Sequence, residues 1–525
     1  MLKAALIVDG NSIKRWQKEA LDYSCDLLDI VIILSCKNTV PKRKYFKNFI
    51  YYVVNFFTLK NKYTKIISLD LKDVNFLEFE SIYDGDWQKI PSSALDKIRT
   101  LEIDIILKFG MNLLRIDEEL NNLKIFSYHH GDPSLFRGRP AGFYELLQLN
   151  NSVGTIVQEL SNKIDAGKIW AIGHSKVYHY SYKKTAINFF SNSKFLLRKS
   201  LLNLKHNTPV EILCDGTLYK LPDNLLVLKF LILISIRKFK HLIYGCFFEK
   251  KWNIVTYEDR NIFESKQMEV KSGTSPKIDS RYSFYADPQF SSSASIIRVE
   301  ALNSLNGVGE ILEIDSTSLQ TRKRLLKGRH FAYPQSICVN DEEFLFPEVA
   351  AHSSPYLLRQ PFDGSRKLFL KGIEKYRIID GTLFKKDDTF YLFCGLNLNA
   401  SDCLYLFYAN SIEQEFNWHP LNPIIINPIK ARMGGRIVSL NDKYYRFGQN
   451  NAYEYGNGLT VCEITKLTTT EYEEKEIGTL RFLDANGPHT VDISKNQSVF
   501  DFYTVSFSFL ALYRRIIPKI FSKYS

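Results

Sequence analysis

The sequence lacks the short motifs that mark several common classes of protein. It contains no Gly-x-Gly-x-x-Gly run and no Gly-x-x-x-x-Gly-Lys-Ser/Thr run, so neither a standard dinucleotide site nor an ATP-binding P-loop is expected. Its 8 cysteines are far apart, with no Cys-x-x-Cys pair and no Cys/His cluster at zinc-ligand spacing. We therefore expect free thiols in a reducing compartment and no bound metal.

Long apolar runs are also missing. The N-terminal stretch MLKAALIVDG has only a short apolar run before Asp9, which is too short for a secretory signal and predicts a first β-strand instead. The most apolar segment, Leu225–Ile236, is interrupted by Lys229 and is shorter than the roughly 20 residues that a membrane-spanning helix needs.

Two segments combine apolar and basic residues. Residues 225–236 are followed by Arg237, Lys238 and Lys240, and the C-terminal stretch 511–525 has the same character. Each segment either packs against protein or lies on a membrane surface as an amphipathic helix. We expect a cytoplasmic protein, with peripheral contact at the inner membrane surface as the alternative that these segments leave open.

What the chain does contain is ordinary in charge and hydrophobicity but rich in aromatic residues. Of its 525 residues, 45% are hydrophobic and 24% are charged, which excludes disordered and collagen-like classes and leaves room for two or more domains. Aromatic residues make up 14%, which favours a β-rich region. The net charge of +12 suits phosphate-bearing partners, but no Lys/Arg run resembles a nucleic-acid-binding arm, so nucleic acid is not expected. The oligomeric state stays open.

Residues 1–205 alternate between segments typical of strands and segments typical of helices. The expected strands are 4–8, 29–34, 65–68, 103–108, 124–128, 154–159 and 168–172, and the expected helices include 13–23, 93–100, 141–149 and 184–204. Apolar strands bounded by helices indicate buried parallel strands. This order predicts a doubly wound, Rossmann-like α/β domain whose ligands bind at the carboxyl ends of the strands.

After about residue 250 the pattern changes to short aromatic strands separated by polar turns. An Asn/Asp turn leads into an aromatic strand at 340–346, 386–393 and 441–447, with weaker copies at 293–299 and 496–503. Recurrence every 45–55 residues or so is typical of propeller blades. We predict a five-bladed β-propeller over residues 251–515, with a β-sandwich as the alternative, and a connecting segment over residues 206–250.

The densest group of reactive side chains follows the expected strand 124–128. Ser127, His129, His130 and Asp132 lie within six residues of one another, and Asp165 follows about 35 residues later. Histidines and carboxylates at strand ends can act as general acids and bases. The structural alternative is that these loop histidines only cap turns.

This segment resembles the 10-formyltetrahydrofolate-dependent formyltransferases. Arg137 and Gly138 set the register, which places His129 on the family's histidine, and Asp165-Ala166-Gly167 matches its catalytic aspartate segment. Upstream, Phe109 and Gly110 match the loop that meets the folate. The resemblance implies 10-formyltetrahydrofolate as the formyl donor, with Phe109, Gly110, Arg137 and Gly138 contacting it.

The resemblance also implies a role for each residue of the group. His129 would stabilise the oxyanion of the tetrahedral intermediate, and Asp165 would be its partner. The family's asparagine position holds Ser127, or Tyr128 if His130 is aligned instead, so one oxyanion donor is replaced. Asp132 is additional and would either contact an amine or sugar hydroxyl or cap the helix near residue 141.

Residues 251–510 resemble the five-bladed propellers that include family-43-type glycoside hydrolases, and especially the N-terminal region of plant glucosamine inositolphosphorylceramide transferases. Asp287, Glu348 and Asp380 are the candidate acid and base residues, and Arg432 lies in a further matching stretch. Their order along the chain differs from the glycosidase pattern, so the resemblance favours glycan binding over hydrolysis.

Three functions follow from these resemblances. The first is transfer of a formyl group to the amine of an amino sugar, nucleotide-linked, in surface polysaccharide synthesis. The second is glycosidase or glycosyl-transfer-related chemistry in the propeller. The third is a glycan-binding scaffold in which Ser127 marks a degenerate formyltransferase site.

Overall fold

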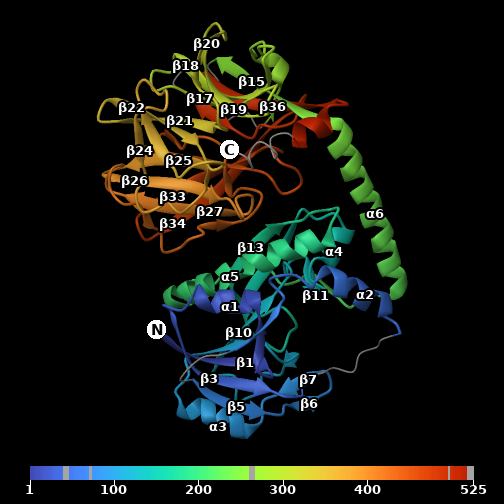
Figure 1. The fold of residues 1–525 in the computed structure, drawn as a ribbon. Coiled ribbons are helices and arrows are strands. Elements are labelled where there is room, and N and C mark those ends of the chain that lie inside the picture. The colour runs from blue at the N-terminus through green and yellow to red at the C-terminus, as the bar shows by residue number, and fades with distance from the viewer. Residues whose placement is uncertain (39–45, 70–73, 259–266, 495–496, 517–525) are drawn as a thin grey trace. The chain divides into compact units, whose positions relative to one another are not determined.

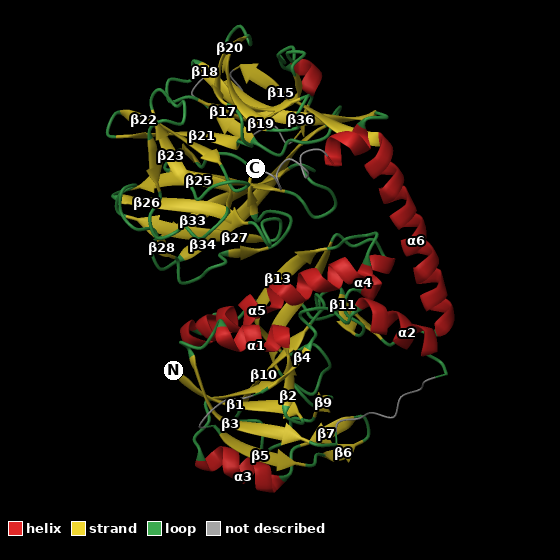
Figure 2. Cartoon of the chain, in the orientation of Figure 1, coloured by secondary structure: helices red, strands yellow, loops and turns green. Residues whose placement is uncertain are grey.

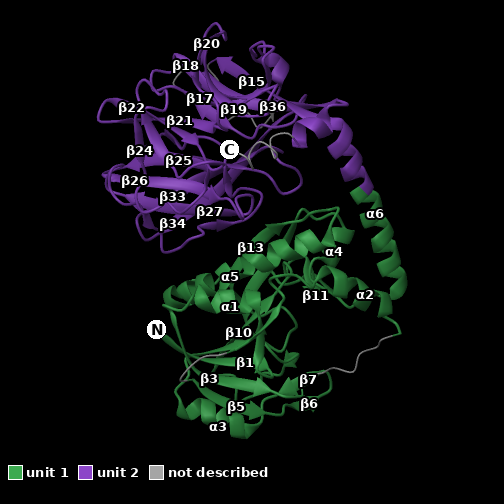
Figure 3. Ribbon diagram, viewed as in Figure 1, with its two compact units in different colours: residues 1–238 green, residues 239–525 purple. Residues whose placement is uncertain are grey.

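The computed structural model describes residues 1–38, 46–69, 74–258, 267–494 and 497–516. The chain divides into two compact units, Met1–Lys238 and Phe239–Ser525 (Figure 3). The division falls inside helix α6 (Asn224–Phe247), within the segment 206–250 that the sequence predicts as a connection. Across these described ranges, no helix is long and apolar enough to cross a membrane.

Unit 1 is built on a twisted sheet of mostly parallel strands (Figures 1 and 2). The parallel strands, in spatial order, are β5 (Asn75–Phe79), β3 (Leu28–Cys36), β1 (Leu2–Asp9), β8 (Ile105–Lys108) and β10 (Lys124–His129). Two antiparallel strands, β12 (Ser152–Glu159) and β13 (Lys168–Lys176), extend the sheet beyond β10. The expectation of parallel strands is therefore wrong for these two, because the loop between them is too short to hold a crossover.

Helices and short strands complete unit 1. The helices are α1 (Arg15–Asp22), α2 (Phe49–Thr58), α3 (Ser92–Thr100), α4 (Phe143–Leu147) and α5 (Tyr182–His206). The short strands are β2 (Ser12–Lys14), β4 (Ile66–Ser68), β6 (Ile82–Asp84), β7 (Trp87–Lys89), β9 (Leu113–Leu114), β11 (Phe136–Gly138) and β14 (Thr217–Tyr219). Strand β4, expected at 65–68, pairs antiparallel with β2 and not with the parallel strands.

The two faces of the sheet are covered by different helices. On one face, α3 packs Ala94, Leu95 and Ile98 against Ile106 of β8 and Ile125 of β10. On the other face, α1, α4, α5 and the start of α6 form an aromatic-rich cluster with β12. Because side chains alternate along a strand, each residue at the carboxyl end of β10 belongs to one face or the other.

Unit 2 consists of sheets whose strands are antiparallel, except that β16 pairs parallel with β34. The first of four successive sheets contains β17 (Tyr282–Phe290), β18 (Ile296–Asn303), β19 (Gly309–Asp315) and β20 (Thr321–Leu326), and the second contains β21 (Ala332–Val339), β22 (Glu342–Glu348), β23 (Tyr356–Arg359) and β24 (Lys367–Phe369). The third contains β25 (Ile378–Lys386), β26 (Thr389–Leu396), β27 (Cys403–Ala409), β28 (Asn417–Trp418) and β29 (Ile425–Ile426). The fourth contains β30 (Arg432–Met433), β31 (Val438–Leu440), β32 (Lys443–Gln449), β33 (Leu459–Leu467) and β34 (Tyr472–Phe482), together with β16 (Gln267–Met268). The short helix η1 (Val270–Ser272) follows β16.

A fifth sheet joins the two ends of unit 2. Strand β15 (Phe248–Glu258) pairs antiparallel with β36 (Gln497–Phe507) along the full length of both strands, and β35 (Val491–Ile493) pairs with β36 on its other side. The first strand of the unit is therefore held by the last described strand. Asn496, part of one expected hairpin, and residues 517–525 of the basic C-terminal segment lie outside the described residues.

The hairpin turns expected from Asn/Asp pairs are confirmed. Asn340 and Asp341 join β21 to β22, and Asn441 and Asp442 join β31 to β32, all four with positive φ. Two consecutive left-handed residues are what a type I′ hairpin requires, and Asn and Asp tolerate that conformation better than other residues with a Cβ. Asp387, in the third turn, also has positive φ.

The first strands of three successive sheets share an irregularity. Strands β17, β21 and β25 each carry a break in register, and at each break one residue adopts positive φ: Asp287, Tyr333 and Asp380. A bulge of this kind redirects the side chain and is common beside functional sites. It aims buried polar groups from several sheets toward one region of unit 2.

Candidate functional site

His129 and Asp165 form the pair that the sequence predicts in unit 1. The His129 Nδ1 atom lies 3.3 Å from Asp165 Oδ1, and the imidazole is buried at the carboxyl end of β10. Its Nε2 atom lies 3.3 Å from the Phe136 carbonyl oxygen. Both ring nitrogens thus face acceptor oxygens, an arrangement that suits an imidazolium donating at both positions.

Arg137 and Gly138 position Asp165. The Gly138 N–H donates to Asp165 Oδ2 at 2.8 Å, and the Arg137 guanidinium donates twice to the Ile164 carbonyl, at 3.1 and 2.7 Å. Asp165 itself has positive φ, 49°. The two residues that the resemblance assigns to folate contact are therefore engaged in holding the aspartate loop against β11.

His130 lies apart from this pair although it is the next residue. It packs against the rings of Trp16, Phe189 and Phe190, and its Nε2 atom lies 3.0 Å from Ser193 Oγ. Burial, assisted by the positive charges of His129 and Lys14, lowers the pKa of His130 to about 3. His130 is therefore a neutral residue of the aromatic cluster and not part of the reactive group.

Lys108, which the sequence analysis did not single out, lies beside the pair. It occupies the last position of β8, in register with Ser127 of β10, and its Nζ atom donates to the Met111 carbonyl at 3.3 Å. Burial lowers the pKa of Lys108 to about 8, while the carboxylates of Asp9 and Asp165 act in the opposite direction. A lysine beside the reactive pair can thus supply positive charge and still give up its proton near neutral pH.

Residue alternation places four polar side chains on one face. Ser127 and His129 are two residues apart on β10, and Lys108 is the register partner of Ser127, so all three share the face on which Ile106 and Ile125 are buried. Asp9, at the end of β1, is close enough to raise the pKa of Lys108. The carboxyl end of the sheet therefore gathers charged groups above an apolar layer.

Phe109 and Gly110, predicted to meet folate, have internal contacts. The Phe109 ring lies 6.1 Å from the rings of both Trp16 and Tyr128. A Cβ at Gly110 would lie 2.4 Å from the carbonyl carbon of Val8 and 2.7 Å from Asp9 Oδ1. The close approach of β1 is thus sufficient reason for a glycine at this position.

Asp132 belongs to a second histidine–carboxylate pair. Its Oδ2 atom lies 3.2 Å from Nε2 of His174 on β13, and its Oδ1 atom accepts hydrogen bonds from the backbone and hydroxyl of Ser134. Burial opposes ionisation, but these hydrogen bonds lower the pKa of Asp132 to about 2. Asp132 therefore closes a turn with Ser134, and the expectation that it caps the helix near residue 141 is wrong, because the N-cap residue of α4 is Gly142.

In unit 2, three of the four predicted residues meet directly. The Arg432 guanidinium donates to both carboxylate oxygens of Asp380, at 2.5 and 3.2 Å, and the Asp380 N–H donates to Glu348 Oε2 at 2.9 Å. Gln449 Nε2 adds a 2.8 Å hydrogen bond to Asp380 Oδ2. Burial and the charge of Asp380 raise the pKa of Glu348 to about 8, so this carboxyl is protonated at neutral pH.

Asp287, the fourth predicted residue, lies in the same buried region. Burial raises its pKa to about 6, and the Thr490 hydroxyl donates to its Oδ1 atom at 2.8 Å. It shares a hydrogen bond with Glu300, a residue absent from the predicted set, whose pKa burial and the charges of Asp287 and Glu348 hold well above its ordinary value. Several acids of one region thus resist ionisation together.

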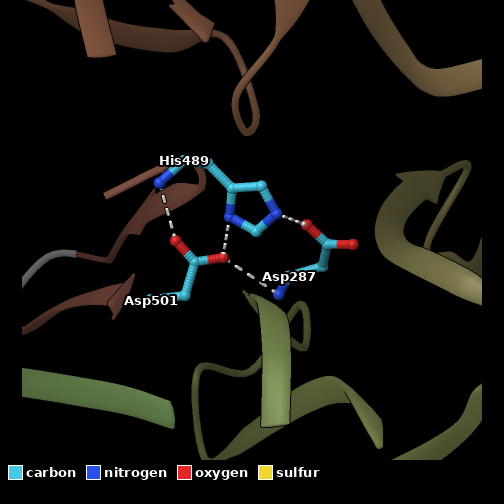
Figure 4. A group of neighbouring side chains, drawn as sticks. All are labelled: Asp287, His489 and Asp501. Carbon is cyan, nitrogen blue, oxygen red and sulfur yellow. Dashed lines mark hydrogen bonds and ion pairs between the residues drawn. The ribbon is translucent and has the colours of Figure 1, made fainter. Parts of the chain in front are cut away.

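His489 and Asp501 complete this region (Figure 4). His489 Nδ1 contacts Asp501 Oδ2, and its Nε2 atom lies 3.5 Å from Asp287 Oδ1. The Asp501 carboxylate also accepts backbone N–H bonds from His489, Thr490 and Asp287, at 2.8, 2.9 and 3.2 Å. Burial lowers the pKa of His489, but the two carboxylates outweigh it and the net shift is upward.

The atoms of Asp287, His489 and Asp501 are close enough to hold a metal ion. The hydrogen bonds favour another interpretation. Both ring nitrogens of His489 face carboxylate oxygens, and both Asp501 oxygens already accept hydrogen bonds. The three side chains satisfy one another as an ion-paired group.

Simple sequence signals existed for some of the residues that were missed. Lys108 interrupts the apolar run Ile105–Leu107 at a strand end, where a charge has little structural reason. His489 follows Gly487 and Pro488 in a turn. Glu300 and Asp501 lie in apolar strands, where alternation alone does not show which face is buried.

Comparison with known protein families finds one match, in unit 2. Residues 302–490 match the family described as the N-terminal region of glucosamine inositolphosphorylceramide transferase 1. A rice (Oryza sativa subsp. japonica) glucosamine inositolphosphorylceramide transferase 1 is 30% identical over 156 residues, which are 28% of this chain and 20% of the rice protein. The chain thus matches about a fifth of that relative's length. Over residues 302–490, this match confirms the predicted resemblance to the N-terminal region of plant glucosamine inositolphosphorylceramide transferases.

Two solved structures each resemble a part of the chain. Phosphoribosylglycinamide formyltransferase from Anaplasma phagocytophilum is 12% identical, covers 41% of this chain and 92% of its own, and gives a TM-score of 0.28. An exo-1,5-α-L-arabinanase from a bovine ruminal metagenomic library is 11% identical, covers 39% of this chain and 86% of its own, and gives a TM-score of 0.30.

Proposed function

We propose that unit 1 transfers a formyl group from 10-formyltetrahydrofolate to the amine of an amino sugar, nucleotide-linked, in surface polysaccharide synthesis. The observation that carries this proposal is the buried His129–Asp165 pair with Lys108 beside it, at the carboxyl end of a largely parallel sheet. Open α/β sheets bind their ligands at that end. Unit 1 would use the positive charge of His129 and Lys108 on a carbonyl that becomes negative during the reaction.

The chemistry needs charge stabilisation and one proton transfer. The amine nitrogen attacks the formyl carbon, a C–N bond forms, and the carbonyl oxygen gains negative charge. The bond from the formyl carbon to the donor nitrogen then breaks, and the proton that the amine loses ends on that donor nitrogen. Donors aimed at the oxyanion typically contribute a factor of about 100–1000 each in rate.

His129 and Lys108 are the two donors available for this oxyanion. Asp165 fixes the imidazole through Nδ1, which leaves Nε2 to exchange its long contact with the Phe136 carbonyl for the formyl oxygen. Lys108 occupies the position in register with Ser127, where the family's asparagine side chain is absent. We propose that the lysine ammonium replaces that carboxamide as the second donor.

The site that would bind the formyl donor, 10-formyltetrahydrofolate, is less well defined than the His129–Asp165 group. Phe109, Gly110, Arg137 and Gly138 all have internal contacts that account for them without a folate. The choice of 10-formyltetrahydrofolate therefore rests on the reactive group and the resemblance, and no step is assigned to the pterin.

Isothermal titration calorimetry with 10-formyltetrahydrofolate tests the donor directly. We expect saturable binding that His129→Ala leaves intact and Phe109→Ala weakens, because the first residue acts on the formyl group and the second lies in the loop predicted to contact the folate. Absence of binding to the full chain at millimolar concentration contradicts the proposal.

For unit 2 we propose a five-bladed propeller that binds glycan. The five sheets, the repeated bulge in β17, β21 and β25, and the pairing of β15 with β36 all support this arrangement. A propeller places the first strand of each blade around a central channel, where Asp287, Glu348, Asp380 and Arg432 would present polar groups to sugar hydroxyls.

Glycan processing in unit 2 is the second candidate function. It is favoured by one observation: Glu348, with its pKa raised to about 8, lies next to the Arg432-paired carboxylate of Asp380. A protonated acid beside an ion-paired carboxylate is the arrangement that acid–base cleavage uses. Turnover of an oligosaccharide panel that Glu348→Gln removes and His129→Ala retains would establish this function instead.

A further inference from the structure

Apolar side chains are exposed along helix α2 of unit 1. Phe49, Val53, Phe56 and Phe57 are all exposed, and Phe46, just before the helix, is 97% exposed. Tyr51 alone among the residues of α2 is fully buried, on the side that packs into the aromatic cluster. A surface helix ordinarily turns its apolar side to the core, so α2 has a second apolar side that the unit does not cover.

Helix α6 continues this surface. Leu225, Leu228, Ile232 and Ile236 are exposed at spacings of three or four residues, which places them in one stripe along the helix. The opposite side carries Phe230, buried against the ring of Phe143 at a centroid distance of 4.2 Å. The stripe therefore faces away from the core of unit 1.

The two helices are joined at their N-terminal ends (Figure 1). The Asn224 side chain accepts from the Ile50 N–H at 3.0 Å and donates to the Phe46 carbonyl at 2.8 Å. Asn48 Nδ2 donates to the Pro222 carbonyl at 2.7 Å. Phe46 and Leu225 consequently lie close together. We call the exposed apolar residues of both helices the α2–α6 face: Phe46, Phe49, Val53, Phe56, Phe57, Leu225, Leu228, Ile232 and Ile236.

The charge around the α2–α6 face is mostly positive, although Asp223, an exposed acid just before α6, accepts the Leu226 N–H beside Leu225. Residues 46–69 and all of α6 contain no Asp or Glu, whereas Lys47, Lys60, Lys62 and Lys65 lie in the first segment and Lys229, Arg237, Lys238 and Lys240 in the second. Lys60 Nζ lies 3.8 Å from the centre of the Phe56 ring, so cation and aromatic ring are side by side. Apolar residues bordered mainly by lysine complement an anionic lipid surface.

A second copy of the chain is a poorer partner for this face. A symmetric dimer pairs the same patch with itself, so lysines of one copy would oppose lysines of the other. Asp223 offsets only one of the eight cations that lie in the two segments. A bilayer with anionic headgroups both covers the apolar side chains and neutralises the cations.

We propose that the α2–α6 face binds the surface of a bilayer that contains anionic lipid. The helices lie in the plane of the interface, with Phe46, Phe49 and Leu225 in the boundary between headgroups and acyl chains, and the lysines remain at headgroup level. This docking is independent of the chemistry proposed for His129.

Flotation of the full chain with lipid vesicles tests the proposal. We expect binding to phosphatidylcholine vesicles that contain one quarter phosphatidylglycerol, and weaker binding to phosphatidylcholine alone or at high salt. The Phe46→Glu/Phe49→Glu variant should bind the anionic vesicles roughly a hundredfold more weakly, at roughly tenfold for each apolar side chain removed. Ile82→Glu, on exposed strand β6 away from both helices, is the matched control and should bind like the parent.

Three outcomes overturn the proposal. One is absence of binding to anionic vesicles, and another is equal binding by the parent and the Phe46→Glu/Phe49→Glu variant when both melt at the same temperature. The third is concentration-dependent dimerisation in sedimentation velocity that this variant abolishes, without vesicle binding by the parent. That result would assign the face to a second copy.

Discussion

His129 and His130 are adjacent residues in opposite chemical environments. His129 lies on the face of the sheet that carries Lys108, between two acceptor oxygens, whereas His130 lies among aromatic rings and has its pKa lowered to about 3. The difference arises at the end of β10, where His129 is the last residue of the strand and His130 is the first residue beyond it. One of the two can hold a positive charge, and the other stays neutral.

The first prediction separates these two histidines. His129→Ala should reduce formyl transfer by about 100–1000-fold, because it removes one oxyanion donor. His130→Phe should retain most of the activity, since a neutral ring fits among Trp16, Phe189 and Phe190. Single-turnover rates with radiolabelled formyl donor measure both. Equal losses in the two variants would argue for a purely structural effect.

The second prediction concerns the pH dependence set by Lys108. If its ammonium is the second donor, kcat/KM should fall as pH rises through about 8, where Lys108 loses its proton. Lys108→Arg should move that decline to higher pH, because arginine keeps its charge. An unchanged alkaline limb in Lys108→Arg would exclude the lysine as the titrating group.

Because of Lys108, the stability of the fold should increase with pH over the range in which kcat/KM decreases. The pKa of Lys108 is lower in the folded state than the ordinary value of 10.5, so the unfolded chain binds more protons between pH 8 and pH 10.5. The free energy of unfolding therefore rises with pH across that window. Below pH 8 the buried charge costs stability in full. Lys108→Met should therefore raise the melting temperature at pH 7 while it removes activity, which thermal denaturation would detect.

At the scale of single residues, the sequence identified His129 and Asp165 but not their neighbours. Adjacent histidines at the end of a strand predict a reactive group. Which of the two faces the site depends on the residue at which the strand ends, and that residue is hard to identify from sequence. Asp132 shows the same limit. Its partner His174 is distant in the chain, so only the pairing of β12 with β13 brings the two together.

At the scale of elements, turns were more predictable than strand partners. The pairs Asn340-Asp341 and Asn441-Asp442 form two-residue turns because both residues accept positive φ. The antiparallel direction of β12 and β13 was not predicted, because an apolar run does not indicate the direction of a strand relative to its neighbours. Helix α2 was also missed, because its apolar side chains do not follow a single helical stripe.

The third prediction tests the turn between β31 and β32. Asp442→Gly should stabilise unit 2 by about 0.5–1 kcal/mol, because Gly adopts the positive φ of 59° without the steric cost of a Cβ. Asp442→Val should destabilise it, since a β-branched residue is strongly disfavoured there. Urea denaturation followed by tryptophan fluorescence distinguishes the two. Destabilisation by glycine would contradict the assigned turn geometry.

At the scale of the whole molecule, two compact units carry separate sets of reactive groups. Unit 1 holds the His129–Asp165 pair, and unit 2 holds the acidic region around Asp380. The sequence predicts two parts because alternating α/β segments and short aromatic strands occupy different regions of the chain. It could not predict that β15 returns to pair with β36, since the partners are more than two hundred residues apart.

The fourth prediction uses that pairing. Val499→Pro should destabilise unit 2 by about 3 kcal/mol or more, because Val499 is buried in β36 and pairs with Thr256 on one side and Asp492 on the other. Unit 1 has its own core, so its calorimetric transition should not move. A shift of both transitions by the same amount would show that the two units unfold as one.

The most direct test of the account is a comparison of two variants in one reaction. Full-length protein is incubated with 10-formyltetrahydrofolate and a panel of nucleotide-linked amino sugars, and formamide products are measured by mass spectrometry. We expect product from the parent chain and from Glu348→Gln, and about 100–1000-fold slower product formation by His129→Ala. No product from the parent on any sugar, or unchanged product from His129→Ala, would contradict the assignment of formyl transfer to the His129–Asp165 pair.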